Sequence, residues 1–303
     1  MRSGELHNSV TPRGHNGVMA QRLLTPSKIT AWLDCAHFLT LRHEVDSGVR
    51  EPAPNMFGEM AQMLVQKGLD HEKAVLEQYR LEGRDVFEVP DWDRGTESFN
   101  QWVARVGDVL SVGHDVVFQM PFVHDGIRGI ADFLERVVDA DGNVTYEPVD
   151  AKLARNEAKP GHVLQLCFYA EAIAAQTGQL PQRMHIELGS GVRETIRVDD
   201  VLAYWRRLRN QLAALVAEPP TEQTKPEPCD HCGFCEFEQM CDAEWRAADS
   251  LVHVAGVRRT DRALLEADGI DTIAHLSTLD HEVPELDATR VVKMVRQASL
   301  QVV

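Results

Sequence analysis

The stretch GIRGIADFLERVVDADGNVTYEPVDAKLAR, residues 126–155, decides the fold of this chain of 303 residues. It contains two runs rich in β-branched and other apolar residues, at 128–138 and 144–152, separated by the turn-forming sequence Asp-Ala-Asp-Gly-Asn. Two such runs joined by a short segment of Asp, Gly and Asn are typical of a β-hairpin. We therefore expect two antiparallel strands at the middle of the chain.

Both strands of this hairpin carry an acidic residue among apolar ones. Asp132 lies in the first strand, and Asp150 and Lys152 lie in the second. Side chains two residues apart in a strand point to the same face, so Asp150 and Lys152 should project together, with Asp132 converging from the neighbouring strand. Glu147 has an odd spacing from Asp150 and is expected on the opposite face. Pro148 cannot donate to a central ladder, so it requires a bulge or a strand start.

Two carboxylates and an ammonium in this arrangement fit the hydrolysis of a phosphodiester. Hard oxygen ligands hold Mg²⁺ or Mn²⁺, which activate water and neutralise phosphate oxygens. The ammonium of Lys152 would orient the water or stabilise charge that develops on phosphorus. Asp-x-Lys also occurs by chance on solvated strand faces, so this pattern alone does not decide the function.

Helices are expected on both sides of the β-rich middle, which makes the fold class α/β. The first helix begins after a hydroxyl cap and a first-turn proline at Thr25-Pro26-Ser27 and continues to Leu39. A loop is expected at 46–55. The further expected elements are a helical stretch at 56–82 with a break near Gly68, a helix at 96–111, a helix at 160–177, a hairpin at 183–198 and an amphipathic helix at 201–216.

Residues on two of these helices extend the acidic pattern. His71 lies late in the helical stretch 56–82, and Gln165 and Tyr169 lie one turn apart on the helix after the Asp150 strand. The order His71, Asp132, Asp150-Ala151-Lys152 and Gln165-x-x-x-Tyr169 resembles the RecB-like branch of the PD-(D/E)XK nucleases. That resemblance implies a restriction-endonuclease-like core, in which helices flank a central mixed sheet.

The resemblance also assigns roles. It implies that His71, Asp132 and Asp150 bind Mg²⁺ or Mn²⁺, with help from the carbonyl of Ala151, and that Lys152 is catalytic. It further implies that Gln165 and Tyr169 position the DNA strand. The role of Glu72, next to His71, stays open.

The charge of the chain restricts how it could hold DNA. Lys and Arg number 31 against 47 Asp and Glu, which gives a net charge of −16. This balance argues against a surface that binds polyanions as a whole, so a DNA site must be local. Arg128, Lys152, Arg155 and Lys159 could supply such local charge, although Arg155 and Lys159 also fit a solvated loop.

Four of the six cysteines fall in the sequence CDHCGFCEFEQMC, residues 229–241. The chain shows neither an apolar run of membrane-spanning length nor a signal-peptide pattern, so we expect a cytoplasmic protein. Thiols stay reduced there, and clustered cysteines are then metal ligands more often than disulfides. Zinc and an iron–sulfur cluster are both candidates. Only Gly233 and Phe234 separate Cys232 from Cys235, and ligands so close would strain a tetrahedral zinc site.

The spacing of three of these cysteines resembles a known cluster motif. Cys232, Cys235 and Cys241, with Cys35 far upstream, are similar to the ligands of AddB-type nucleases and of the CRISPR-adaptation relatives of RecB. The resemblance implies a [4Fe–4S] cluster on these four residues that staples the N-terminal helix to the end of the nuclease domain. Cys229 is either spare or a replacement for Cys35, and Cys167 is expected to be a core residue.

Three regions are therefore expected along the chain: a disordered leader at 1–22, a nuclease domain at 23–245 closed by the cysteines, and a helical unit at 250–303. Residues 262–279 resemble a helix-hairpin-helix element, with Asp271 at the second hairpin glycine. An acid there should repel phosphate, so we expect a small packing unit.

The resemblance implies a metal-dependent deoxyribonuclease, an exonuclease on single-stranded DNA ends in DNA repair or recombination. It also implies a helicase or an RNase H-like domain, either as a partner or as a C-terminal domain missing from this chain. Two alternatives stay open: a nuclease-fold module that binds DNA or has a structural role without catalysis, and a zinc-binding protein of other function.

Overall fold

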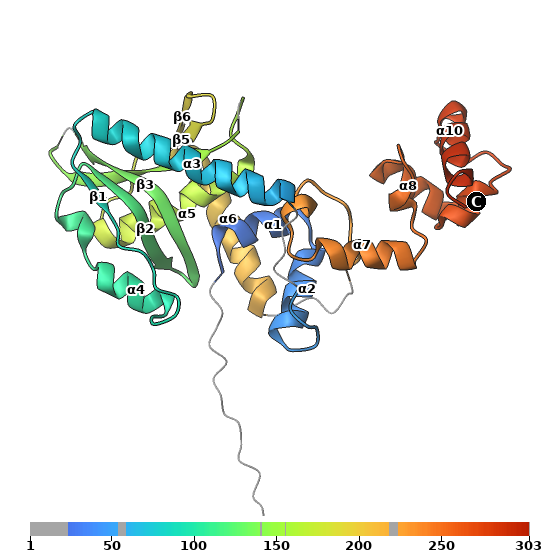
Figure 1. Cartoon of the computed structure of the whole chain (residues 1–303), viewed down its shortest axis with the longest axis horizontal. Helices are drawn as coiled ribbons and strands as arrows, with labels where there is room; N and C mark the ends of the chain where they lie inside the picture. The colour runs from blue at the N-terminus through green and yellow to red at the C-terminus, as the bar shows by residue number, and fades with distance from the viewer. Residues whose placement is uncertain (1–23, 54–58, 140, 155, 218–223, 303) are drawn as a thin grey trace, which may run out of the picture.

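A computed structural model describes residues 24–53, 59–139, 141–154, 156–217 and 224–302 (Figure 1). The leader expected at 1–22 and the candidate DNA-binding residue Arg155 lie outside these ranges. None of the described helices is both long and apolar enough to span a lipid bilayer.

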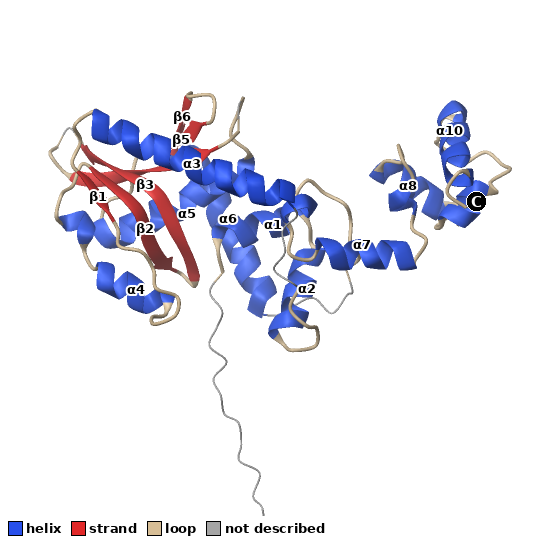
Figure 2. Cartoon of the chain, viewed as in Figure 1, coloured by secondary structure: helices blue, strands red, loops and turns tan. Residues whose placement is uncertain are grey.

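A six-stranded mixed sheet lies toward one end of the molecule, at the left in Figure 2. Its strands lie side by side in chain order: β1 (Val86–Glu88), β2 (Val116–His124), β3 (Ile127–Val138), β4 (Val144–Lys152), β5 (Arg183–Leu188) and β6 (Arg193–Arg197). The pairs β1/β2 and β4/β5 are parallel, and the other neighbours are antiparallel. The predicted α/β fold with a mixed sheet flanked by helices is confirmed, and it is consistent with a restriction-endonuclease-like core.

Helices cover both faces of this sheet. α3 (Glu59–Leu81) lies across one face, where Val75, Leu76 and Tyr79 pack on residues of β2, β3 and β4. α5 (Pro160–Thr177) and α6 (Val198–Ala217) lie on the other face and share the main hydrophobic core with α4 (Phe99–Val106). Each helix is held by the apolar stripe it buries, as is usual for a layered α/β domain.

The structure corrects the expected course of the first helix. The chain forms α1 (Pro26–Asp34), breaks at Cys35 in an extended conformation, and continues as α2 (His37–Asp46). Thr25 caps α1 as predicted, its hydroxyl accepting from the amide of Lys28 at 3.3 Å. α2 occupies the start of the loop expected at 46–55. The break is tertiary in origin, because Phe38 turns to pack edge-on against Phe237, 5.7 Å away between ring centroids.

Two further expectations for the middle of the chain were wrong. α3 runs without a break through Gly68, and the helix expected at 96–111 is α4 followed by a separate 3-10 turn (Val109–Ser111), because Gly107 ends α4 with φ +65°. Pro148 needs no bulge. It pairs in register with Leu134 of β3, and pairing with β5 begins one residue later, at Val149.

The C-terminal part of the chain forms a second, smaller core. α7 (Glu238–Ala247) leads from the cysteine segment to α8 (Arg259–Ala267), α9 (Ile273–Ser277) and α10 (Ala288–Ser299) (Figure 1). These last three helices enclose their own apolar cluster, which includes Leu265, Leu276 and Met294. An ion pair of 2.6 Å between Arg262 and Glu227 ties this unit to the segment before the cysteines.

Candidate active site and cysteine cavity

β3 and β4 bring Asp132, Asp150 and Lys152 into one buried cluster. An oxygen of Asp132 accepts from the amide of Ala151 at 2.9 Å. The Nζ atom of Lys152 lies 2.8 Å from both carboxylate oxygens of Asp150 and donates a hydrogen bond to Oδ1. Asp132 is 9% exposed and Asp150 only 1%. The two acids therefore share one site, and the ammonium of Lys152 points into it.

Glu72 of α3 joins this cluster from above the sheet. Its carboxylate accepts a hydrogen bond of 2.9 Å from the side-chain amide of Gln119. Gln119 is a β2 residue with φ +59°. Gln119 and Asp132 face each other where the β2/β3 ladder is interrupted, between the pairs Phe118↔Phe133 and Met120↔Ala131. A non-glycine residue in the left-handed region is strained, and such strain is often found at functional sites.

The helical spacing of α3 could have predicted that Glu72 joins the cluster, but the resemblance pointed to its neighbour His71. Glu72 has the helical spacing of Val75, Leu76 and Tyr79, which are the residues of α3 that pack on the sheet. An acid on that stripe faces the sheet, and Glu72 is half-buried there. His71 borders the stripe, and its Nε2 atom donates to the carbonyl of Glu187 at 3.0 Å. Within the described ranges, no hydrogen bond or ion pair joins His71 to Asp132 or Asp150.

The electrostatics of the cluster call for an additional positive charge. Burial and the neighbouring Asp150 raise the pKa of Asp132 to about 7. Burial and Asp132 likewise raise the pKa of Glu72 to about 7. Burial lowers the pKa of Lys152, but Asp150 and Asp132 outweigh it, so the pKa lies above its ordinary value. Three carboxylates thus face one ammonium in a buried site.

One atom of the cluster is a candidate ligand for a cation. Oδ2 of Asp150 is buried and accepts no hydrogen bond within the described part of the chain, although it forms an ion pair of 2.8 Å with Nζ of Lys152. Hard oxygen donors with excess negative charge are the ligands that Mg²⁺ and Mn²⁺ prefer. Across the described residues, however, no three His, Cys, Asp or Glu side chains already stand in a metal-binding arrangement. The carboxylates now engaged by the amide of Ala151 and by Lys152 would turn toward an ion.

Gln165 and Tyr169 lie on α5, beneath β3. Tyr169 is 2% exposed, and its hydroxyl donates to the carbonyl of Ile130 at 2.5 Å. The half-buried Gln165 donates to that hydroxyl at 3.3 Å. Gly129 permits this approach, because a Cβ atom there would lie 3.0 Å from the Tyr169 ring. Tyr169 therefore fixes β3 two residues before Asp132, and Gln165 is the member of the pair that keeps exposed surface.

A comparison with protein families now assigns the chain. The model of the PD-(D/E)XK nuclease superfamily matches residues 24–242. The chain belongs to this superfamily. Its members are generally nucleases and typically use Mg²⁺ or Mn²⁺. No curated protein matched the chain in a search of such proteins. The matched range contains the whole sheet, the acidic cluster and all of the cysteines.

In this superfamily member, five cysteines line one cavity between the two ends of the matched domain. Cys35, from the break between α1 and α2, lines it together with Cys229, Cys232, Cys235 and Cys241. The Sγ atoms of Cys229 and Cys232 are 3.8 Å apart. Phe38, Leu41 and Phe237 surround the cavity, and burial raises the pKa of Cys241 to about 12. As they stand, the cysteines are not arranged around a metal ion either, within the part of the chain that is described.

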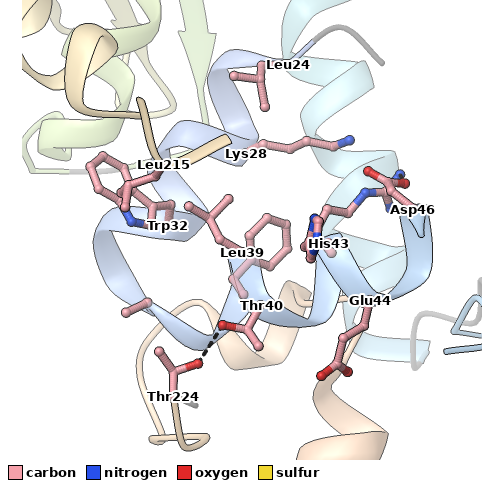
Figure 3. A pocket seen from close by; sticks show the side chains of 13 residues that line it. Leu24, Lys28, Trp32, Leu39, Thr40, His43, Glu44, Asp46, Leu215 and Thr224 are labelled. Carbon is pink, nitrogen blue, oxygen red and sulfur yellow. Dashed lines mark hydrogen bonds and ion pairs between the residues drawn. The ribbon is translucent and has the colours of Figure 1, made fainter. Parts of the chain in front are cut away.

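A second cavity of this nuclease-superfamily chain lies beside α1 and α2 and contains none of the predicted site residues (Figure 3). Trp32, Leu39 and Leu215 form its apolar wall, and Thr40 and Thr224 are hydrogen-bonded at 2.7 Å along one side. Lys28 also lines it. The titratable side chains of His43, Glu44 and Asp46 line it as well.

The helix-hairpin-helix-like element satisfies its own amides. At the start of α9, the amide of Ile273 donates to the carbonyl of Asp249 at 2.8 Å, and that of Ala274 donates to the Asp249 side chain at 2.9 Å. The amide of His275 donates to Thr272 at 3.1 Å. Donors that could hold a DNA phosphate are therefore already engaged by acceptors of this chain, which supports a packing role for this unit.

Proposed function

We propose that this chain is a metal-dependent deoxyribonuclease that hydrolyses phosphodiester bonds of DNA. The observation that carries the proposal is the buried convergence of Asp132, Asp150 and Lys152, in which two carboxylates face one ammonium. Asp132 and Asp150 would hold Mg²⁺ or Mn²⁺ with the carbonyl of Ala151. Glu72 is placed to add a third carboxylate, and His71 would have to leave the Glu187 carbonyl to take part.

Different residues of the chain would have different roles in the reaction. A divalent cation bound at the carboxylates would supply positive charge to the phosphate oxygens and to the attacking water. Lys152, held by Asp150 at 2.8 Å, is fixed where its ammonium can stabilise the negative charge that grows on the phosphoryl oxygens. Gln119 holds Glu72 in position, and Tyr169 holds the β3 backbone beside Asp132.

We further propose an exonuclease of the RecB-like type that acts on single-stranded DNA ends in the cytoplasm, in repair or recombination. The order of His71, Asp132, Asp150-Ala151-Lys152 and Gln165-x-x-x-Tyr169 supports this assignment. A helicase or an RNase H-like unit, as a partner or as a further domain, would act together with the nuclease on such ends. Gln165 and Arg155 would contact the strand, and the regions 23–245 and 250–303 would be the nuclease domain and its helical appendage.

We also propose a [4Fe–4S] cluster on Cys35, Cys232, Cys235 and Cys241. The support is that these residues, from opposite ends of the domain, line one cavity beneath apolar side chains. Such a cluster would contribute stability to the contact between α2 and α7 and would take no part in hydrolysis. Iron, sulfide and zinc analysis of anaerobically purified protein tests this directly, because stoichiometric zinc without iron would contradict it.

A cleavage assay on labelled single strands tests the catalytic proposal. We expect no cleavage in EDTA and cleavage in Mg²⁺ or Mn²⁺, because the carboxylates alone cannot neutralise the phosphate. Linear strands should be shortened from an end while circular single strands survive. Cleavage of the circles would contradict the exonuclease mode. Intact linear DNA in both metals would contradict the enzyme and favour a binding module.

A further inference from the structure

A groove lined by aromatic and cationic side chains leads away from the acidic cluster between α3 and the β1–α4 segment. Glu72 and Gln119 close one end of it, so the groove is continuous with the candidate active site. Its other lining residues include Lys73 and Arg94, and its aromatic ones are Trp92, Trp102 and Phe118. We call this surface the Trp92 groove.

The Trp92 ring is held rigidly in this groove. It stacks on Trp102 at 5.9 Å between centroids and 7° between planes, and Phe99 meets it edge-on at 5.2 Å. Its indole nitrogen donates to the carbonyl of Glu97 at 3.0 Å. The ring is nevertheless only half-buried, and the guanidinium of Arg94 lies over it at 4.9 Å. A flat apolar surface is thus pre-positioned beneath an exposed, movable cation.

The cations at this groove differ from most arginines of the chain. Arg80 and Arg105 nearby form ion pairs with glutamates. By contrast, Lys73, Arg94 and Arg128 form no ion pair with any residue that the structure describes. Arg128 lies 5.9 Å from the Trp92 ring centroid. In a chain with a net charge of −16, these three unpaired charges make a local positive surface.

The acidic residues of the groove neutralise little of this positive charge. Glu88 is neutralised by its ion pair with Arg80, and Glu72 belongs to the acidic cluster. Asp91 at the rim remains an exposed carboxylate. Two unpaired cations line the groove, Lys73 and Arg94, and Arg128 lies beside the Trp92 ring. Against one free acid they favour a polyanion, and the Trp92 face favours one with accessible bases.

We propose that single-stranded DNA binds along the Trp92 groove, which rests on the proposed nuclease function and identifies the path of its substrate. An unpaired base stacks on Trp92 in place of the Arg94 guanidinium. Arg94 and Lys73 then pair with the flanking phosphates, and the strand reaches the acidic cluster at Glu72, beside Gln119. Duplex DNA has no free base to offer this ring, so the groove selects single strands.

Equilibrium binding of a fluorescent oligonucleotide in EDTA tests the groove without any cleavage. We expect Lys73→Ala/Arg94→Ala to weaken binding and to reduce the salt dependence of log K by about 1.4, at about 0.7 for each phosphate that the protein no longer neutralises. Trp92→Leu should weaken binding roughly tenfold, with Trp92→Phe close to wild type. Lys293→Ala/Arg197→Ala, which removes two exposed cations elsewhere, is the matched control.

The possible outcomes distinguish failure of the groove proposal from failure of the proposed nuclease function. Equal loss of binding in the groove and control double variants would overturn the groove, as would wild-type affinity in Trp92→Leu. Trp92→Leu removes packing on Trp102. Lys73 and Arg94 are exposed, so their double variant tests the groove independently of folding. Tighter binding of RNA or duplex than of single-stranded DNA would overturn the choice of ligand. Groove-dependent binding without metal-dependent cleavage would overturn only the proposed function.

Discussion

Asp150→Asn is expected to abolish metal-dependent cleavage of DNA while the chain still folds. The substitution keeps the shape of the side chain but removes the charge that pairs with the ammonium of Lys152, 2.8 Å away, and that would hold the proposed cation. A loss of about 4 kcal/mol of transition-state stabilisation corresponds to roughly a thousandfold lower rate. Single-turnover cleavage of a labelled single strand in Mn²⁺ would measure it.

Glu147→Gln is the matched control for this substitution. Glu147 lies on the same strand, β4, but bonds to His185 at 2.9 Å and to Arg183 at 3.3 Å, away from the acidic cluster. Its neutralisation should lower the free energy of unfolding by about 1–3 kcal/mol, because the buried His185 loses its charged partner, and should leave the cleavage rate nearly unchanged. Similar cleavage rates in the two variants would contradict the assignment of Asp150.

Cys232→Ser is expected to remove the proposed [4Fe–4S] cluster and loosen the contact between the N-terminal helices and α7. With the cluster absent, this contact would rest on the packing of Phe38 on Phe237 and on ion pairs such as those of Arg42 with Glu236 and Arg50 with Glu244. A loss of about 3 kcal/mol would lower Tm by roughly 6–12 °C for a domain of this size. Iron content, visible absorption and limited proteolysis near α2 would report the change.

The remaining cysteines supply the controls for this prediction. Cys35→Ser should also lose iron, whereas Cys229→Ser should keep it if Cys35 is the fourth ligand. Cys167→Ala lies in the core of α5 and should keep the cluster. Full iron content in Cys232→Ser, or equal iron loss in all four variants, would be incompatible with the proposed ligand set.

Local sequence signals specify the part of the fold that carries the acids. The alternating apolar runs and the Asp-Ala-Asp-Gly-Asn turn predict β3 and β4 closely, since register in a hairpin is set by the turn and by the buried face. Two-residue spacing then places Asp150 beside Lys152. Pro148 was harder to place, because whether it disturbs a ladder depends on where the next strand begins to pair.

Tertiary contacts decide the features that the sequence did not predict. Residues 27–39 contain no glycine or internal proline, so nothing local signals the break at Cys35; packing of Phe38 on Phe237 produces it. The positive φ of Gln119 is likewise imposed by its surroundings. The place of Glu72 in the cluster, by contrast, follows from its spacing along the helical stripe of α3 that packs on the sheet.

Calorimetric titration of Mn²⁺ into the wild-type protein and into Asp132→Asn/Asp150→Asn tests most directly whether these carboxylates form a cation site. We predict saturable binding by the wild type and none at this site in the double variant, with iron content and Tm showing that both proteins are folded. Equal Mn²⁺ binding by the two proteins, or no binding by the wild type, would contradict the metal-dependent mechanism.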